Sequence, residues 1–158
     1  MTAMFRCMLF PLLFLMPLSV AAGPDRYSFL LGSHHLNATS DFNEFNPGVF
    51  ATWGERQTFS LGIYENSYSE TSIAALYHYP LTPADQQWQL SAFAGLAEYP
   101  NDGRRFVSNL FGDVVVLAGV QVQRGNLFVQ AIPCYCGAVD IIFSGGLTFS
   151  SDELSKRR

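Results

Sequence analysis

Residues 139–149 have the sequence VDIIFSGGLTF, in which apolar side chains recur at every second position up to a final phenylalanine. Side chains alternate between the two faces of an extended strand, so these apolar residues share one face. Alternation of this kind is typical of barrels that cross the outer membranes of bacteria, with one face toward lipid and the other toward the lumen. The residues expected on the lipid face are Val139, Ile141, Phe143, Leu147 and Phe149.

Seven earlier segments show similar alternation and are separated by turn residues. The complete set of expected strands is 27–37, 45–53, 58–65, 71–79, 87–97, 113–123, 126–132 and 139–149. Eight is an even number and the smallest usual strand count for an outer-membrane barrel. We therefore predict an all-β fold, an eight-stranded antiparallel up-and-down transmembrane β-barrel, which we expect to be a monomer.

The connections between these strands fall into two kinds. Short, turn-like connections are 54–57, 80–86 and 124–125, and connections with more functional side chains are 38–44, 66–70 and 98–112. Outer-membrane barrels have short periplasmic turns and longer external loops. With the N-terminus in the periplasm, the second kind of connection is expected on the external rim.

The first 22 residues have the anatomy of a cleaved signal peptide: a short start with Arg6, an apolar run over 8–18, and a small-residue end. The apolar run is about half of the roughly 20 residues that a membrane-spanning helix needs. The expected division is a signal peptide over 1–22, a barrel over 23–149 and a charged C-terminal tail over 150–158 in the periplasm.

The composition favours a surface that meets lipid. Charged residues make up 14% of the chain and aromatic residues 15%, whereas soluble domains usually carry about 25% charge. Tyrosine and tryptophan favour membrane interfaces, and His78 is expected at one. The net charge of −4 argues against a nucleic-acid partner, which a basic stripe would attract. We expect the cell outer membrane as the location.

Cysteine usage predicts neither a metal site nor a cofactor. Cys134 and Cys136 form a C-x-C pattern with no matching cluster of histidines or cysteines, which a zinc site would need. In an oxidising envelope the two could pair with each other or remain free thiols in a loop.

The expected lumen is mixed, apolar toward the middle and outer end and richer in glutamine toward the periplasmic end. Inward glycines leave two interpretations open, tight packing around glycine bends or a slot for a hydrocarbon chain. The candidate substrate-binding residues on the inward face are Phe93, Gly95, Leu117, Gly119 and Phe128.

Residues able to do chemistry are expected on the external rim. His34 and His35 end the first strand, Glu44 lies in the first external loop, and Asn66 and Ser67 begin the second. A histidine, a serine and a polar orienting group on one rim could make an activated hydroxyl for acyl transfer.

Three short motifs resemble the PagP family of outer-membrane lipid A palmitoyltransferases. Residues 41–48, DFNEFNPG, are similar to the family's Tyr-Asn-Glu-Arg-Pro-Trp-Gly, and 62–68, GIYENSY, are similar to a strand that ends in Lys-Asp-Ser-Trp. Ile132-Pro133 resembles an Ile-Pro-Gly near the end of the family's seventh strand. Together the motifs span most of the expected mature chain.

The resemblance implies transfer of a fatty acyl chain from a phospholipid to lipid A, a modification of lipopolysaccharide, with the lumen measuring the chain. The family's catalytic histidine falls on His35, with His34 as the alternative, and its Asp-Ser pair falls on Asn66 and Ser67. Pro133 would mark broken strand pairing through which a lipid passes sideways, because proline removes a ladder donor.

Other functions remain open. Asn66 replaces an acid and cannot stabilise an imidazolium as a carboxylate would, which favours a non-catalytic structural or lipid-binding barrel. A lipid A deacylase barrel, also built on histidine and serine, would hydrolyse instead of transferring.

Overall fold

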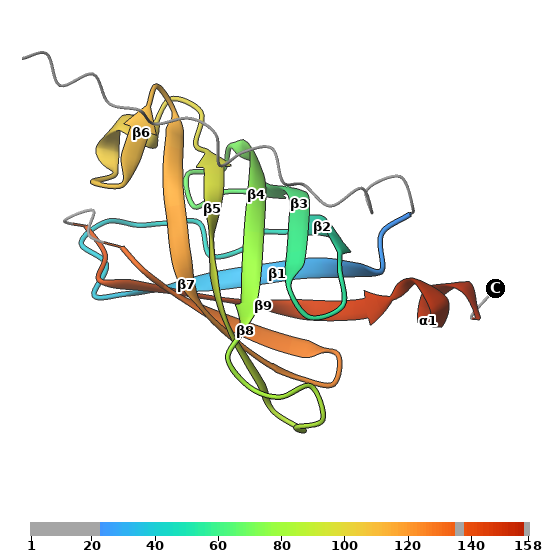
Figure 1. The fold of residues 1–158 in the computed structure, drawn as a ribbon. Helices are drawn as coiled ribbons and strands as arrows, with labels where there is room; N and C mark the ends of the chain where they lie inside the picture. The colour runs from blue at the N-terminus through green and yellow to red at the C-terminus, as the bar shows by residue number, and fades with distance from the viewer. Residues whose placement is uncertain (1–22, 135–137, 157–158) are drawn as a thin grey trace, which may run out of the picture.

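The computed structural model describes residues 23–134 and 138–156, and its main feature is a set of long strands that curve around a common axis (Figure 1). The expected signal peptide over 1–22 lies outside the described residues, as does Cys136. The strands are β1 (Arg26–Leu36), β2 (Gly48–Trp53), β3 (Thr58–Glu65), β4 (Thr71–Pro80), β5 (Gln89–Glu98), β6 (Asn109–Phe111), β7 (Val114–Arg124), β8 (Leu127–Pro133) and β9 (Ile141–Ser150).

Eight of these strands form a closed antiparallel barrel. The order β5-β4-β3-β2-β1-β9-β8-β7 is closed by pairing between β5 and β7, and every neighbour runs antiparallel. The predicted all-β fold with an eight-stranded antiparallel β-barrel is therefore confirmed. The short strand β6 and a 3-10 helix, Gly103–Arg105, were not predicted; both lie in the connection between β5 and β7.

The two ends of the barrel differ. One end, called here the loop end, carries the two longest connections, 37–47 and 99–113, together with 66–70 and the link from β8 to β9. The other, the turn end, carries the connections 54–57, 81–88 and 125–126, the start of β1 and the end of β9. His35, Glu44 and Ser67, which were expected on one rim, thus lie together at the loop end.

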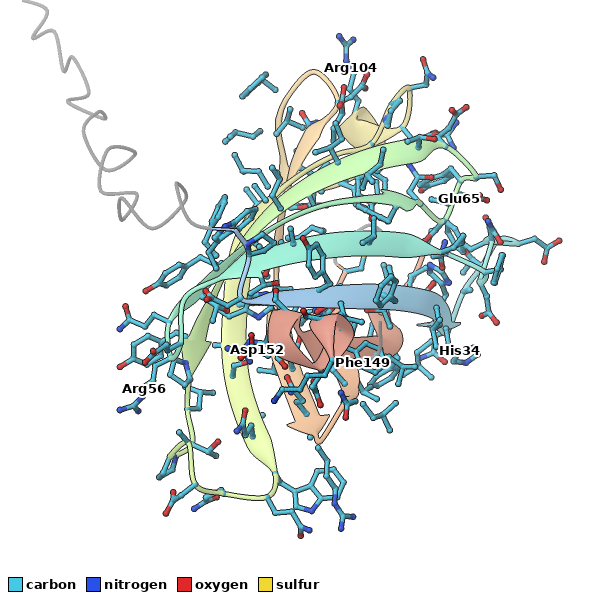
Figure 2. The ribbon with its side chains drawn as sticks, turned by 90° about the vertical axis from the view of Figure 1, so that its right-hand side faces the viewer. His34, Arg56, Glu65, Arg104, Phe149 and Asp152 are labelled. Atoms are coloured by element: carbon cyan, nitrogen blue, oxygen red, sulfur yellow. The ribbon has the colours of Figure 1, made fainter. Side chains whose placement is uncertain are left out.

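Alternation along the strands separates a filled interior from an apolar exterior. Phe93, Val115 and Phe128 are buried inside, as the inward pattern of their strands predicts. The outward positions are exposed and apolar, and Figure 2 shows side chains projecting around the barrel. Large exposed apolar residues on the strands include Phe29, Leu31, Leu61, Ile63, Ile73, Tyr77, Leu96, Val120, Leu127, Val129 and Phe143.

The inward glycines are filled by neighbouring groups and do not leave open space. A Cβ on Gly119 would lie 2.9 Å from Cζ of Phe93, and one on Gly146 would lie 2.8 Å from Cζ of Phe128. At Gly95 a Cβ would collide with the backbone carbonyl of Ala75. Of the two interpretations of these glycines, the geometry favours tight packing.

Pairing between β7 and β8 stops short of the loop end. The ladder runs from Arg124↔Leu127 to Val120↔Ala131. Beyond it, Pro133 pairs only with β9, opposite Ile141. The sequence-based expectation of broken pairing next to Pro133 thus matches the strand register.

Several boundaries differ from expectation. Val139 precedes β9 and is buried, so it does not share the outward face of Phe143. Phe45 was expected in a strand, but it lies in a connection and is 68% exposed. The expected charged tail contains a short helix, α1 (Ser151–Ser155), because Ser150 and Glu153 form a reciprocal capping box at its start. No helix among the described residues is long and apolar enough to cross a membrane.

Gly146→Ala should destabilise the barrel, since its Cβ would meet the Phe29 carbonyl and the Phe128 ring. Overpacking of this kind costs about 1–3 kcal/mol. Gly145→Ala is the matched control, because its nearest neighbours are at ordinary contact distances of 3.4 and 3.9 Å. Urea unfolding of the refolded barrel in detergent measures both variants, and equal midpoints would contradict the packing of Phe128 on Gly146.

Candidate active site

The loop end brings His35 and Ser67 into direct contact. His35 is the penultimate residue of β1, and Ser67 lies two residues beyond the end of β3. Nε2 of His35 lies 2.8 Å from Oγ of Ser67, and the His35 side chain is buried, at 5% exposure. Figure 2 shows their neighbours His34 and Glu65 at this end of the barrel. The contact is a hydrogen bond of ordinary length.

A β-bulge decides which histidine faces inward. Ser28 and Leu30 line the interior, but the register between β1 and β9 shifts between Leu30 and Gly32. After the shift, odd-numbered residues point inward, so His35 reaches the interior and His34 is exposed. A bulge re-aims side chains in this way because it adds one unpaired residue to a strand. The structure therefore favours His35 over the alternative His34.

The first loop bridges β1 and β3 where β2 has not yet begun. The Ser33 N–H donates to the Glu44 carbonyl at 2.8 Å, and the Asn43 N–H donates to the Ser67 carbonyl at 2.9 Å. Gly32 allows this approach, since a Cβ there would lie 2.7 Å from the Glu44 carbonyl oxygen. These backbone bonds hold the two strand ends, and with them His35 and Ser67, at a fixed separation.

Asn66 shapes the turn that presents Ser67 and does not contact His35 in any hydrogen bond within the described residues. Its Oδ1 accepts from the backbone N–H groups of Tyr68, at 2.8 Å, and Glu70, at 3.1 Å. Its Nδ2 donates to Oγ of Ser72 at 2.9 Å, and the side chain is 1% exposed. The geometry differs from the expected orienting role.

The His35 ring is held by stacking. Phe42 stacks on the imidazole with centroids 4.7 Å apart, and Tyr68 packs edge-on against Phe42 at 5.6 Å. Nδ1 of His35 is buried and has no hydrogen-bond partner among the described residues. The site therefore lacks the carboxylate that usually bonds this nitrogen in a catalytic triad.

The carboxylate of Glu44 contacts both His34 and the backbone of His35. Its Oε1 accepts from the His35 backbone N–H at 3.3 Å and lies 2.9 Å from Nδ1 of His34. The bond from the His35 backbone lowers the pKa of the Glu44 carboxyl below its ordinary value, so the group stays ionised at neutral pH. A negative charge is thus fixed next to His35 without touching its ring.

Aromatic residues from three loops cover His35 and Ser67. Phe42, Tyr68, Tyr99 and Phe106 surround a small hollow that His35 and Ser67 also line. None of the four lies in a strand, so the alternation of apolar residues along the strands could not predict that they line this site. Cys134, the residue directly after β8, also lines the hollow and is disulfide-bonded, so it is not a free thiol.

Below Ser67 a second, mostly apolar cavity extends into the barrel. Its lining includes Phe93 and Leu117 of the expected substrate-binding set, together with Leu76, Ile132 and Ser67. The volume open to water is about 60 Å³, enough for a few water molecules. Of the remaining candidates, Phe128 lines a different cavity nearer the turn end, and Gly95 and Gly119 are backed by neighbouring groups.

No model of a known protein family matches this chain, and no curated protein is significantly similar to it in sequence.

Asn66→Ala should destabilise the barrel by about 1–3 kcal/mol, since two backbone N–H groups and a buried hydroxyl would lose their partner. Ser72→Ala removes only one of these bonds and should cost less. Urea unfolding in detergent compares the two. If Asn66→Ala were as stable as the parent, the turn would not depend on this side chain.

Proposed function

We propose that the protein is an outer-membrane acyltransferase that moves a fatty acyl chain from a phospholipid to lipid A. The observation that carries the proposal is the 2.8 Å contact between Nε2 of His35 and Oγ of Ser67, at the top of an apolar cavity. A base in contact with a hydroxyl makes a nucleophile, and an apolar cavity next to it suits a hydrocarbon chain.

In the proposed reaction His35 is the general base and Ser67 the nucleophile. Nε2 of His35 takes the hydroxyl proton as Oγ of Ser67 attacks the ester carbonyl of the phospholipid. The lysophospholipid leaves with the proton that His35 returns, and the acyl chain remains on Ser67 as an ester. A hydroxyl of lipid A then attacks this ester, with His35 again accepting and returning a proton, and Ser67 is restored.

The barrel exterior supports a membrane location. Outward positions on β1, β3, β4, β7, β8 and β9 carry exposed aliphatic and aromatic side chains. Soluble monomers rarely expose contiguous apolar surface on this scale, whereas a membrane barrel presents an apolar band to lipid. In this proposal the loop end faces outward and the turn end faces the periplasm.

The split between β7 and β8 offers a sideways path for a lipid. Pairing stops at Val120↔Ala131, and the next residues toward the loop end include Leu117 and Ile132, which line the apolar cavity. A chain that passes between the strands would reach this cavity below Ser67. The cavity is too small for a long acyl chain as it stands, so binding would require side chains such as Phe93 to shift.

Hydrolysis is the second candidate, since the same His35–Ser67 contact serves both reactions. If lipid A were the acyl donor and water then attacked the acyl-serine ester, the products would be a free fatty acid and a lipid A with one acyl chain fewer, and the protein would be a lipid A deacylase. The identity of the products separates the two functions.

His35→Ala and Ser67→Ala should each lower acyl transfer by at least about 100-fold, because general-base catalysis contributes about 10²–10⁴-fold. The double variant should be little worse than either single one, because the two residues act as one unit. Mass spectrometry of lipid A from cells that express each full-length form measures transfer as the gain of one acyl chain.

His34→Ala tests the alternative histidine. Its side chain is exposed and outside the cavity and contacts only Glu44 among the residues given a role here, so its loss should lower transfer far less than His35→Ala. Each form must also fractionate with outer membranes and migrate as a heat-modifiable barrel. Loss of an acyl chain from lipid A would support the deacylase. Unchanged lipid A with a folded, membrane-inserted protein, or full activity in His35→Ala, would contradict the catalytic role.

Glu44→Gln should lower the turnover number and leave KM nearly unchanged, because glutamine can accept the His35 N–H bond but carries no charge. A carboxylate at this place stabilises the imidazolium that forms when His35 takes a proton. The loss should be smaller than the about 10²–10⁴-fold expected for a general base. Glu44→Asp should recover part of the turnover, and equal turnover in Glu44→Gln and the parent would exclude the charge effect.

A further inference from the structure

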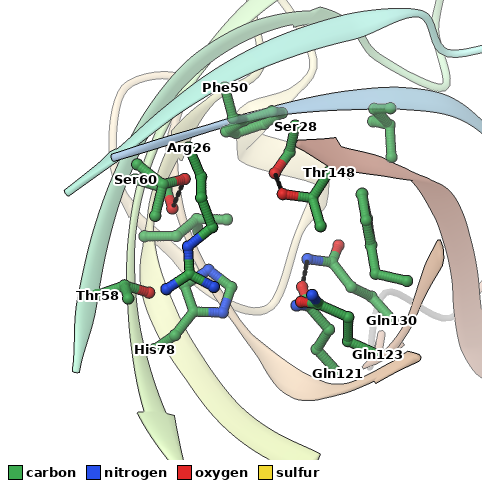
Figure 3. Close-up of a pocket in the computed structure, with 14 residues that line it drawn as sticks. Arg26, Ser28, Phe50, Thr58, Ser60, His78, Gln121, Gln123, Gln130 and Thr148 are labelled. Atoms are coloured by element: carbon green, nitrogen blue, oxygen red, sulfur yellow. Dashed lines mark hydrogen bonds between the residues drawn. The ribbon is translucent and has the colours of Figure 1, made fainter. Parts of the chain in front are cut away.

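The turn end encloses a polar compartment that the acyl-transfer site does not use. Figure 3 shows side chains from β1, β3, β4, β7, β8 and β9 converging on it. Leu30, Phe50, Leu76 and Phe128 form its apolar part. The volume open to water is about 80 Å³. The polar lining is Arg26, Ser28, Thr52, Thr58, Ser60, His78, Gln121, Gln123, Gln130 and Thr148.

This lining contains one permanent cation and no carboxylate. The hydroxyl groups and amides are neutral, and several satisfy one another: Ser28 bonds Thr148 at 3.0 Å, and Gln130 donates to Gln121 at 2.9 Å. No aspartate or glutamate of the described residues forms an ion pair with Arg26. Within the lining of this compartment, no acidic side chain offsets the positive charge of Arg26.

Some N–H groups of the Arg26 guanidinium make no hydrogen bond to the described residues. Nη2 donates to the backbone carbonyls of Gly54, at 3.3 Å, and Glu55, at 3.1 Å. Arginine has five N–H donors, and no hydrogen bond from Nε or Nη1 to a described residue accompanies these two. The two backbone bonds fix the guanidinium at the turn end, and Figure 3 shows it extending from β1 into the compartment beside His78.

His78 adds a second donor at the same place. This residue was expected at a membrane interface, but it lines the lumen instead, with its ring 5.4 Å from that of Phe93. Its ring nitrogens make no hydrogen bond within the described part of the chain. A neutral imidazole has one N–H donor and a protonated one has two, so an anion beside Arg26 could be bound by both residues.

The compartment opens at the turn end. A neighbouring cavity, with about 160 Å³ open to water, shares Arg26, Thr58, His78, Gln121 and Gln123 with it and extends to Glu55, Arg56 and the connection between β4 and β5. A small solute can thus reach Arg26 from the mouth without crossing the barrel wall.

We propose that this compartment binds a small oxyanion of the phosphate class, with Arg26 as the charged anchor and His78 as the second donor. A guanidinium fork matches the oxygens of phosphate in a bidentate arrangement, and neutral hydroxyl and amide groups around it complete the shell. The ligand is a free, water-soluble anion, because it reaches Arg26 through the mouth. Its binding requires no acyl-transfer activity.

Isothermal titration calorimetry of the refolded full-length mature barrel in a zwitterionic detergent tests the proposal, with inorganic phosphate as the probe and chloride as the only other anion. We expect saturable one-to-one binding. Arg26→Gln should weaken it by at least about tenfold, which is the factor that 1.4 kcal/mol produces. Arg26→Lys should be intermediate, because lysine keeps the charge and loses the fork. His78→Ala should also weaken binding.

Arg56→Gln is the matched control, since Arg56 lies at the same mouth but does not line the inner compartment. Heat-modifiable migration on gels confirms that each variant is folded; if Arg26→Gln is not, Arg26→Lys and His78→Ala carry the test. Glycerol 3-phosphate, titrated in parallel, distinguishes a lipid headgroup from free phosphate, and tighter binding of it would overturn the assignment to a free anion. Absence of saturable binding, or an equal loss in Arg56→Gln, would overturn the site.

Discussion

Closure of eight strands leaves an interior just wide enough for side chains to fill, and this constraint governs the rest of the structure. Aromatic rings fit inside only where the facing strand carries glycine, as Phe93 does against Gly119 and Phe128 does against Gly146. Leu30, Phe50, Leu76 and Gln130 line both a polar compartment at the turn end and an apolar cavity toward the loop end, so they lie at the boundary between the two. The barrel therefore holds two chemically different spaces, one polar and one mostly apolar.

The candidate site depends on a departure from regular pairing. An unbroken β1 would continue the inward parity of Ser28 and Leu30 and would point His34, not His35, into the barrel. The bulge between Leu30 and Gly32 reverses that parity, and the loop around Glu44 then supplies the backbone partners that β2 does not reach. The bulge, the glycine and the loop act together, because Gly32 leaves the space that the Glu44 carbonyl occupies. Irregular backbone is thus concentrated where the histidine and serine meet.

Sequence patterns predicted what depends on alternation and failed where local backbone geometry decides. The eight barrel strands, the inward face of Phe93 and Phe128, and the placement of His35 and Ser67 at one end follow from period-two alternation and strand counting. The bulge has no such signal, so the choice between His34 and His35 stayed open. The hydrogen bonds that Asn66 makes to the backbone of its own turn also have no signal in alternation, because they follow from the local conformation of that turn. The strand β6 was missed because three residues are too few to show alternation. The two interpretations of the inward glycines stayed open because a sequence shows that a side chain is absent but not which ring fills its place.

Electrostatics gives the two ends of the barrel different capacities. At the loop end, the Nδ1 of His35 lies buried without a partner, and the nearest fixed negative charge comes through the backbone, from a Glu44 carboxylate bonded to the His35 N–H. Such a charge is more exposed to solvent screening than a carboxylate in a triad, so it can bias proton transfer but not dominate it. At the turn end, the side chains that line the inner compartment together with Arg26 include no carboxylate. The described part of the interior thus supplies no carboxylate to bond Nδ1 of His35 at the loop end, so a complete catalytic triad is absent there. The lack of a carboxylate in the lining around Arg26 favours the binding of an anion at the turn end.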